Sequence, residues 1–293
     1  MALINLGSCC IDHVYHVPQF VSPGETLPCI RYEVHPGGKG LNQSVAMARA
    51  GASIRHAGKI GKDGLWLKAL LDDCGVDTGL MIIDEAATGH ASIQVNAAGE
   101  NAIVLYGGTN RTLTRTEISD MLETCHPGDF LVLQNEISEL HHAMTQGAAQ
   151  GLRMVFNAAP MTAEVKSLPL DQLELLIINE VEGAAISGRE APADILDELL
   201  VNFPALGVVL TLGAEGAVYA RGSARVQVSS PAVKAVDTTG AGDTFTGYLV
   251  AGYSAGQSVE TAMTTACQAA AISVTRPGAA SSIPTLEEIK AAT

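Results

Sequence analysis

The sequence lacks several common patterns, and each absence removes a class of protein. No apolar run reaches the length of about 18 residues that a membrane-spanning helix requires. Basic residues are few and scattered: 17 Lys and Arg stand against 31 Asp and Glu, for a net charge of −14. We therefore expect no transmembrane helix and no surface that binds nucleic acid or an anionic membrane.

Other motifs are missing as well. The six cysteines form no C-x-x-C pair and have no histidine at zinc-finger spacing. Residues 1–7 have no basic segment and are typical of a first β-strand, not of a signal peptide. These features predict a cytoplasmic protein with reduced thiols. Neither G-x-x-x-x-G-K-[ST] nor G-x-G-x-x-G occurs, which argues against a Walker-type nucleotide site and leaves an NAD enzyme with little support.

What the chain does have is an alternation of apolar strand-like runs and helical patterns. This alternation predicts βαβ units and a mainly parallel sheet within a single α/β domain of 293 residues. Strands are expected at 3–6, 54–59, 80–83, 130–134, 154–157, 175–178 and 208–212, and helices at 41–50, 65–74, 115–123, 139–150, 195–203 and 258–274. Thr114 with Glu117, and Thr285 with Glu288, have capping-box spacing. Segments 13–34 and 91–106 contain strand-like pieces without a helix, so we expect a small β-sheet insert placed as a lid.

The run from Asp237 to Gly247 (DTTGAGDTFTG) is the strongest functional signal. Its small residues precede a helix expected from Asp243 to about Ala255, and the first N–H groups of a helix have no partner within it. Such a terminus attracts phosphate, and the Asp243 carboxylate is placed to take a proton from an attacking hydroxyl. The pattern indicates phosphoryl transfer from a nucleotide to an alcohol. A Gly-rich turn that only starts a helix fits the same residues.

A second glycine-rich segment, 36–43, precedes the first expected helix. Its glycines permit close backbone approach, and Lys39 and Asn42 offer donors that fit sugar hydroxyls. Taken alone, the segment is as well explained by a turn that leads into a helix.

Two further segments follow expected strands, at the edge where an open α/β sheet binds ligands. Asn179 and Glu182 suit a hydrated Mg²⁺ or its phosphate ligands, and equally suit a helix cap with first-turn acids. Thr211, Gly213 and Gly216 belong to a strand and turn against which a nucleotide base or ribose could rest.

Together these motifs resemble the ribokinase-like (pfkB-type) carbohydrate kinase family in order and spacing, over essentially the whole chain, and most closely its ribose-phosphorylating branch. The matching residues are Gly7 to Asp12, Gly37-Gly38-Lys39-Gly40-x-Asn42, Asn179-x-x-Glu182, Thr211-x-Gly213-x-x-Gly216 and Asp237-Thr-x-Gly-Ala-Gly-Asp243. The resemblance implies a three-layer α/β/α sandwich with a β-sheet lid, ATP and Mg²⁺ as cosubstrates, and transfer of the γ-phosphate to a primary hydroxyl of a pentose, D-ribose first.

The resemblance also implies a role for each matching position. Asp243 would be the base, with the amides of Gly240, Ala241 and Gly242 as the anion hole. Residues implied for the sugar are Asp12, Gly38, Lys39, Asn42, Glu136 and Asp243. Those implied for the nucleotide are Asn179, Glu182, Thr211, Gly213 and Gly216. A monovalent cation, potassium, would lie at Asp237, Thr239, Ser273, Arg276, Gly278 and Ser282.

Two residues depart from the family pattern. Cys10 stands where ribokinases have Asn, and related deoxyribokinases have an apolar residue there, so 2-deoxyribose is an alternative substrate; a ketohexose or a nucleoside also stays open. Tyr248 stands where the family has a small residue, and we expect a structural role for it.

Beyond substrate identity, two questions of function and assembly stay open. A sugar- or nucleotide-binding sensor without catalysis is an alternative of another class, although the intact Asp243 argues against it. An exposed edge of the small sheet would allow a homodimer that forms through the lid.

Overall fold

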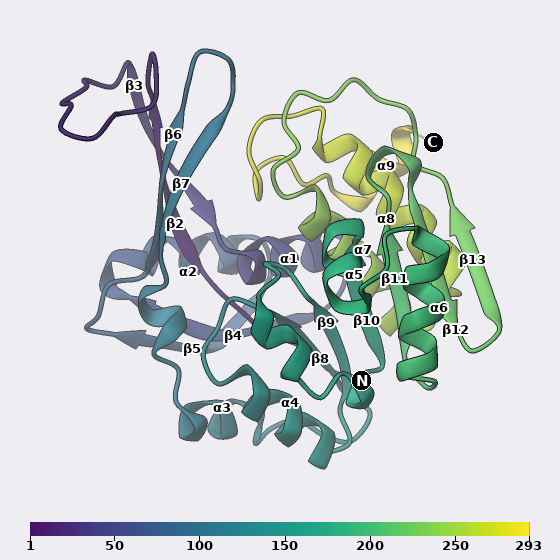
Figure 1. Ribbon diagram of the computed structural model, residues 1–293. Helices are drawn as coiled ribbons and strands as arrows, with labels where there is room; N and C mark the ends of the chain where they lie inside the picture. The colour runs from purple at the N-terminus through teal and green to yellow at the C-terminus, as the bar shows by residue number, and fades with distance from the viewer. Residues whose placement is uncertain (293) are drawn as a thin grey trace.

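The computed structural model, which describes residues 1–292, has a nine-stranded sheet between layers of helices and a four-stranded sheet that projects from the body (Figure 1). The large sheet has the order β13-β12-β11-β10-β9-β8-β1-β4-β5. Its strands are β1 (Leu3–Leu6), β4 (Ile54–Gly61), β5 (Asp77–Asp84), β8 (Phe130–Gln134), β9 (Arg153–Asn157), β10 (Leu175–Asn179), β11 (Gly207–Thr211), β12 (Ala217–Arg221) and β13 (Ala224–Val228). Neighbouring strands from β11 to β5 are parallel, as predicted.

Helices cover both faces of this sheet. On one face lie α1 (Lys39–Arg49), α2 (Leu65–Asp73), α7 (Ala241–Ser254), α8 (Val259–Ser273) and α9 (Leu286–Ala292). On the other lie α3 (Arg115–Leu122), α4 (Leu140–Ala149), α5 (Glu180–Ser187) and α6 (Pro192–Asn202). Short 3₁₀ turns are η1 (Lys62–Gly64), η2 (Gly108–Arg111), η3 (Ala163–Ser167), η4 (Leu170–Gln172) and η5 (Gly213–Glu215). The arrangement is the predicted three-layer sandwich.

The molecule has two hydrophobic cores, one on each face of the large sheet, because side chains alternate in direction along each strand. Successive side chains of a strand point to opposite faces. In β8, Phe130 and Val132 join the core beneath α1 and α7, whereas Leu131 and Leu133 join the core beneath α3 and α4. Because both faces of the parallel strands are buried, the strands read in the sequence as continuous apolar runs.

The hairpin β12–β13 is an element that the sequence analysis missed. It pairs antiparallel with β11 and extends the sheet at one edge. Its two strands mix polar and apolar residues (AVYAR and ARVQV), so neither forms an apolar run. Both predicted capping boxes are present: Glu117 Oε2 accepts from Thr114 N at 2.8 Å, and Glu288 Oε2 accepts from Thr285 N at 2.7 Å.

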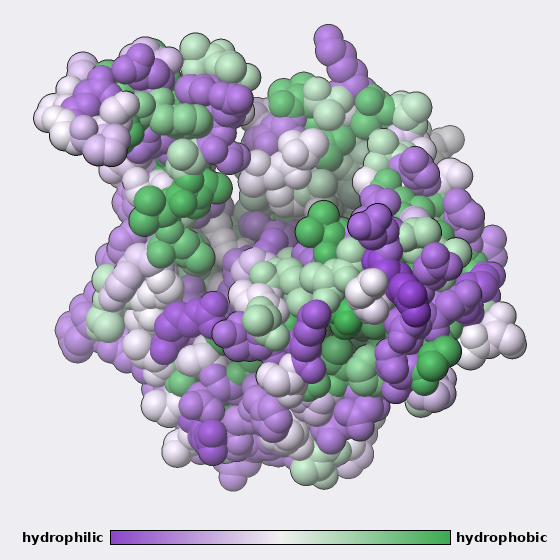
Figure 2. Space-filling view, viewed as in Figure 1, coloured by the Kyte–Doolittle hydropathy of each residue, from purple (hydrophilic) through white to green (hydrophobic). Residues whose placement is uncertain are grey.

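The small sheet combines strands from both predicted insert segments. Its order is β3-β2-β6-β7, with strands β2 (Cys10–His16), β3 (Arg31–Gly37), β6 (Gly89–Val95) and β7 (Asn101–Tyr106). The central pair β2–β6 is parallel and the outer pairs are antiparallel. In the space-filling view a hollow separates this sheet from the body (Figure 2).

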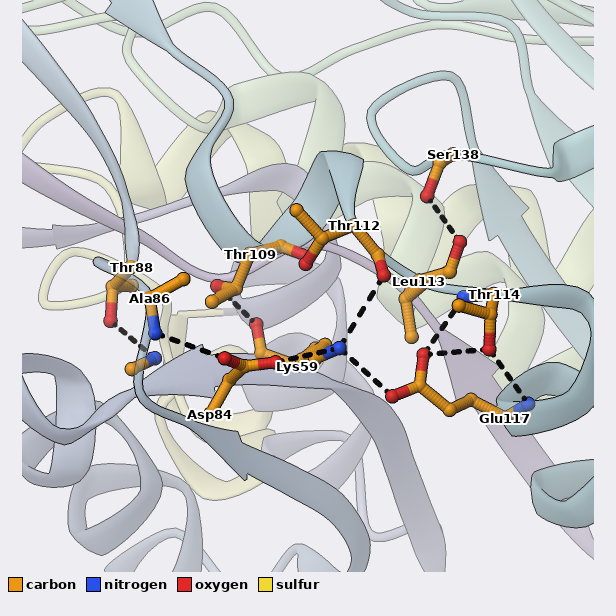
Figure 3. Close-up of polar contacts among 11 residues, drawn as sticks. Lys59, Asp84, Ala86, Thr88, Thr109, Thr112, Leu113, Thr114, Glu117 and Ser138 are labelled. Atoms are coloured by element: carbon orange, nitrogen blue, oxygen red, sulfur yellow. Dashed lines mark hydrogen bonds and ion pairs between the residues drawn. The ribbon is translucent and has the colours of Figure 1, made fainter.

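A buried lysine anchors the small sheet to the body (Figure 3). Lys59, at the end of β4, donates from Nζ to Asp84 and Glu117, each at 2.8 Å, and its carbonyl accepts from Thr109 Oγ1 at 2.8 Å. Asp84 precedes the link into β6 and Thr109 follows β7, so the cluster holds both connections. Burial lowers the pKa of Lys59, but the hydrogen bonds that its ammonium donates to Asp84 and Glu117 outweigh this effect and raise the pKa overall.

The sequence analysis predicted no transmembrane helix and predicted reduced thiols. Among residues 1–292, no helix combines the length and apolar character needed to cross a bilayer. The cysteines are all free thiols, and Cys9, Cys10 and Cys267 are buried.

Candidate active site

Helix α7 begins at the DTTG turn. Gly240 has a φ of 74°, a left-handed conformation that favours glycine, and a Cβ at this position would lie 3.0 Å from the Cβ of Ala279. Ala241 N donates to Thr238 O at 3.2 Å. The N–H groups of Gly240 and Gly242 have no hydrogen-bond partner in the part of the chain that the structure describes. The turn thus presents free amides at the positive end of a helix, with the Ala241 amide already engaged.

Asp243 follows these amides and is buried, with 6% of its surface exposed. Its Oδ2 accepts from Asn42 Nδ2 and its Oδ1 from Gln43 Nε2, both at 3.0 Å. Both donors belong to α1, which packs beside α7 (Figure 1). The carboxylate is therefore held by two amides from a helix about 200 residues away in sequence.

The glycines at the start of α1 allow close approach to the chain's own backbone. Gly38 has a φ of 93°, and a Cβ on Gly40 would collide with the amide of Ser8. Lys39, between them, lines the cavity described below. The negative charge of Asp243 raises the pKa of Lys39 against the opposing effect of burial, with further contributions from Glu136 and Glu182. Lys39 thus carries the positive charge in a group of carboxylates.

Asn179 and Glu182 form a capping box at the start of α5. Asn179 Oδ1 accepts from Glu182 N at 2.8 Å, and Glu182 Oε2 accepts from Asn179 N at 3.0 Å. The cap interpretation is therefore correct, and it leaves Glu182 Oε1 without a hydrogen-bond partner among residues 1–292. Burial raises the pKa of Glu182. A single carboxylate oxygen and a cavity with room for water fit the few protein ligands that Mg²⁺ takes.

Two further carboxylates lie on the other side of Lys39. Glu136 Oε2 accepts from Lys39 N at 2.9 Å and also from Ser8 Oγ. Burial, and then the negative charge of Glu136, raise the pKa of Asp12 to about 6, while His35 opposes the shift. Next to them, Asn42 is 5% exposed and its Oδ1 has no partner. These groups offer acceptors for hydroxyl donors.

A cavity of about 250 Å³ lies where the carboxyl ends of the parallel strands meet α1 and α7. The predicted residues in its lining are Lys39, Asn179, Glu182, Thr211, Gly240, Gly242 and Asp243. The remaining lining residues are Asn157, Ala159, Ile177, Ile178, Thr238 and Thr246. Free amides, a lysine and a buried carboxylate on one cavity are suited to phosphate binding and proton removal.

The pfkB family of carbohydrate kinases matches residues 3–286. The chain belongs to this family. Ribokinase from Haemophilus influenzae is 37% identical over 98% of this chain and 96% of its own length. Deoxyribokinase from Salmonella typhi is 30% identical over 98% and 97%. The crystal structure of ribokinase from Cryptococcus neoformans var. grubii serotype A in complex with ADP superposes with a TM-score of 0.88 at 34% identity, over 100% of this chain and 99% of the other. The predicted family, fold and enzyme class are confirmed.

In this pfkB-family kinase, part of the segment predicted for potassium is held together by Asp237. Its Oδ1 accepts from Thr239 N at 2.9 Å and its Oδ2 from Gly278 N at 2.8 Å. Burial raises the pKa of Asp237, but these hydrogen bonds outweigh it, and the net effect is a lowered pKa. The guanidinium of Arg276 pairs with Glu288 at 2.6 Å and has no acceptor atom, so only the backbone carbonyl of Arg276 could ligate a cation. Ser273 and Ser282 are buried, and each donates its hydroxyl to a backbone carbonyl.

The predicted nucleotide turn joins β11 to β12. Thr211 ends β11 and lines the cavity, and its Oγ1 donates to Ile178 O at 3.3 Å. Gly213 and Gly216 have φ values of 55° and 106° and lie outside the cavity lining. The structure thus places the threonine in the cavity and the glycines in the turn beside it.

Cys10 and Tyr248, the two residues that depart from the family pattern, are both buried. Cys10 is buried, and its Sγ accepts from Asn110 Nδ2 at 3.4 Å. Burial raises the pKa of the Cys10 thiol well above its ordinary value, so the thiol stays neutral. Tyr248 is fully buried in the core under α7, and its hydroxyl donates to Pro284 O at 2.7 Å, which confirms a structural role.

Sequence reasoning missed three amides at the site. Gln43 contacts Asp243, Asn157 lines the cavity, and Asn110 holds Cys9 through its N–H at 3.1 Å and its carbonyl at 2.8 Å. Gln43 follows Asn42 in the predicted segment, but neighbours on a helix point about 100° apart, so its inward direction could not be inferred. Asn110 and Asn157 lie in no motif.

Proposed function

We propose that this chain is an ATP-dependent kinase that phosphorylates the primary hydroxyl of D-ribose to give ribose 5-phosphate. The observation that carries the proposal is the buried Asp243 carboxylate beside the free amides of Gly240 and Gly242 in one cavity. The hydroxyl proton passes to Asp243 as the sugar oxygen bonds to the γ-phosphorus. The bond from that phosphorus to the β-phosphate oxygen breaks, and ADP leaves. The helix N-terminus stabilises the charge that spreads over the transferred group.

The sugar lies between α1 and the base of the small sheet. The unpartnered Oδ1 of Asn42 accepts from one hydroxyl, and the carboxylates of Asp12 and Glu136 accept from others. Gly38 belongs to the same segment, and the Lys39 ammonium lies near Asp243 and attracts the phosphate.

The nucleotide side runs along the ends of β10 and β11. Asn179, Glu182 and Thr211 face the phosphates, and the turn at Gly213 and Gly216 supports the ribose or base. Glu182 Oε1 would hold Mg²⁺ through water. The metal, when bound, would neutralise phosphate charge.

A monovalent cation, potassium, would be held near the anion turn by the loop that Asp237 ties together. Its oxygen ligands would come from the segments of Asp237 and Thr239 and of Ser273, Arg276, Gly278 and Ser282. The support is the hydrogen bonding of Asp237 to Thr239 and Gly278.

The small sheet would close over the sugar, since Asp12 lies at its base. Closure would exclude water and limit hydrolysis of ATP. The outer strand β7 exposes Ile103, Val104, Leu105 and Tyr106 by 52–74%. An apolar edge strand of this kind supports a homodimer that pairs through the small sheets. Light scattering on the intact protein and on Val104→Lys tests the dimer.

The test of activity is sugar-dependent ADP release with Mg-ATP and potassium. D-ribose, 2-deoxy-D-ribose, D-fructose and adenosine are compared at equal concentrations. The proposal expects the highest kcat/KM for D-ribose. Release with none of them, together with ligand-induced stabilisation by ribose or ATP, would instead indicate a binding protein.

A second candidate, 2-deoxyribose, is favoured by Cys10. A neutral thiol is a weak hydrogen-bond partner, so a sugar hydroxyl beside it would lose about 1–3 kcal/mol relative to an amide partner. The substitution Cys10→Asn separates the two candidates: it raises kcat/KM for ribose relative to 2-deoxyribose if the thiol faces the hydroxyl by which these sugars differ. An unchanged ratio would remove Cys10 from substrate selection.

A further inference from the structure

A chain of buried side-chain amides runs beneath the cavity and ends on Asp243. The amides are Asn5 on β1, Gln134 at the end of β8 and Gln43 on α1, and each is 0% exposed. Gln134 Nε2 donates to both Asn5 Oδ1 and Gln43 Oε1 at 2.8 Å. Gln43 Nε2 then donates to Asp243 Oδ1 at 3.0 Å. The three amides form a continuous path from the centre of the sheet to the carboxylate.

The direction of this chain is fixed by a backbone carbonyl at its far end. Asn5 Nδ2 donates to Gly40 O at 2.7 Å and to Ser44 Oγ at 2.8 Å. A carbonyl can only accept, so the nitrogen of Asn5 must face it and the oxygen of Asn5 must face Gln134. Gln134 must then present its nitrogen to both neighbours, and Gln43 must receive that donor on its oxygen. The only orientation left for Gln43 directs its nitrogen at Asp243.

A second backbone carbonyl fixes Gln43 from the other side. Asn157 Nδ2 donates to Ile177 O at 3.2 Å, so Asn157 offers its oxygen, which accepts from Gln43 Nε2 at 3.3 Å. Both hydrogens of Gln43 Nε2 are thus used, one on Asn157 and one on Asp243. A flipped amide at Gln43 would place oxygen against oxygen at Asn157 and Asp243, and nitrogen against nitrogen at Gln134.

One atom in the chain has been left without a partner. Gln134 Oε1 is buried and unpaired, and a Cβ at Gly7 would collide with it. Leaving a buried oxygen unpaired costs free energy. The nitrogen of the same side chain supplies the two hydrogen bonds that join Asn5 to Gln43.

We propose that Gln43 is a positioning residue for phosphoryl transfer, and that Gln134 and Asn157 set its orientation so that a donor always faces Asp243 Oδ1. The inference rests on the proposed role of Asp243 as base. With Oδ1 held by Gln43, the carboxylate cannot rotate, and Oδ2 stays directed at the hydroxyl that binds beside Asn42.

The experiment measures the titration of Asp243 directly, because that readout does not depend on activity. Protein labelled with ¹³C at aspartate carboxyls is titrated by NMR, and the Asp243 resonance is assigned by its loss in Asp243→Asn. We expect the midpoint to move to higher pH by about one unit in Gln43→Met, in which one charge-assisted donor is lost. Gln134→Met, which removes a side chain that neither hydrogen-bonds to Asp243 nor lines the cavity itself, should move it in the same direction by a smaller amount.

Kinetics on the same variants separate this inference from the proposed function. Gln43→Met should lower kcat by about 10²-fold through misplacement of the base, shift the acidic limb of the pH–rate profile upward, and leave KM for ATP unchanged. Gln150→Met, which removes another glutamine with an unpartnered oxygen on α4's C-terminal end, is the matched control and should change neither readout.

The outcomes are distinct. A midpoint that stays in place in folded Gln43→Met and Gln134→Met overturns the inference, whatever the activity. A shifted midpoint combined with full turnover in Asp243→Asn would uphold the orienting chain and overturn Asp243 as the base.

Discussion

Two polar clusters, one under the cavity and one on the small sheet, make similar hydrogen bonds in different surroundings. Under the cavity, Asn5, Gln43 and Gln134 are fully buried and each amide has one possible orientation. On the small sheet, Glu33 Oε2 meets His16 at 3.0 Å and Arg31 at 3.1 Å, but Glu33 is one-third exposed and Arg31 is 60% exposed. Water can replace each partner in the second cluster and none in the first.

The two clusters differ in whether their contacts determine geometry. A buried donor without its partner loses a hydrogen bond that nothing else supplies, whereas an exposed pair exchanges one partner for water at little cost. The buried contacts therefore hold Asp243 in one position, whereas the exposed cluster places little constraint on the small sheet.

The largest expected effect is at the end of the buried cluster. Asp243→Asn should lower kcat by about 10²- to 10⁴-fold, because an amide cannot accept the hydroxyl proton. Steady-state ADP release measures the change, with the exposed Asp171→Asn as a control that keeps normal turnover. Near-normal turnover in Asp243→Asn would remove it as the base.

A substitution at Lys59 tests whether the buried ion pairs that anchor the small sheet contribute more to stability than an exposed pair does. Lys59→Met leaves Asp84 and Glu117 without their shared cation, and we expect a melting temperature lower by about 5–10 °C. The matched control is Lys62→Met, which breaks the exposed pair with Glu85 and should shift melting by about 1 °C or less. Equal shifts in the two variants, measured by calorimetry, would contradict the distinction.

Asp12 belongs to strand β2 of the small sheet, and its titration should make the KM for the sugar depend on pH. Because burial and Glu136 raise its pKa to about 6, the carboxyl is protonated below that pH and becomes a full acceptor above it. The KM for the sugar should therefore fall as pH rises through about 6. In Asp12→Asn the KM should be higher and vary little in this window; a persisting pH dependence would point to a different group.

The smallest effect is expected in the exposed cluster. Glu33→Gln keeps the shape of the side chain and removes only its charge, so the melting temperature should change by about 1 °C or less. The hydrogen bond from His16 lowers the pKa of Glu33, and any stabilising effect is present at neutral pH and is lost as the carboxylate is protonated in acid. A marked loss of stability at neutral pH would show that the small sheet depends on this cluster.

The fold was predictable wherever burial left a pattern in the sequence. Strands β1 and β8 have the predicted bounds because both faces are buried and the residues are all apolar or nearly so. Hairpin β12–β13 was missed because β13 is an exposed edge strand, and because polar residues in both strands hide the strand pattern.

The site was predictable only in its contiguous motifs. Lys39, Asn179 and Asp243 stand in recognisable segments, and the cavity brings them together. Gln134 and Asn5 are single polar residues in apolar strands, and their partners lie up to 129 residues away. Only the register of β1 beside β8 places them in contact.

The order of the elements along the chain also determines which parts of the molecule can fold first during synthesis. A nascent chain that has emerged as far as Val228 contains every strand of the nine-stranded sheet, but α7 and α8 are still missing. The core that contains Val45 and Met47 of α1 then still lacks Tyr248 and Leu249 of α7. Gln43 likewise has no carboxylate to hold. The candidate active site is therefore completed late in synthesis, after all strands of the nine-stranded sheet.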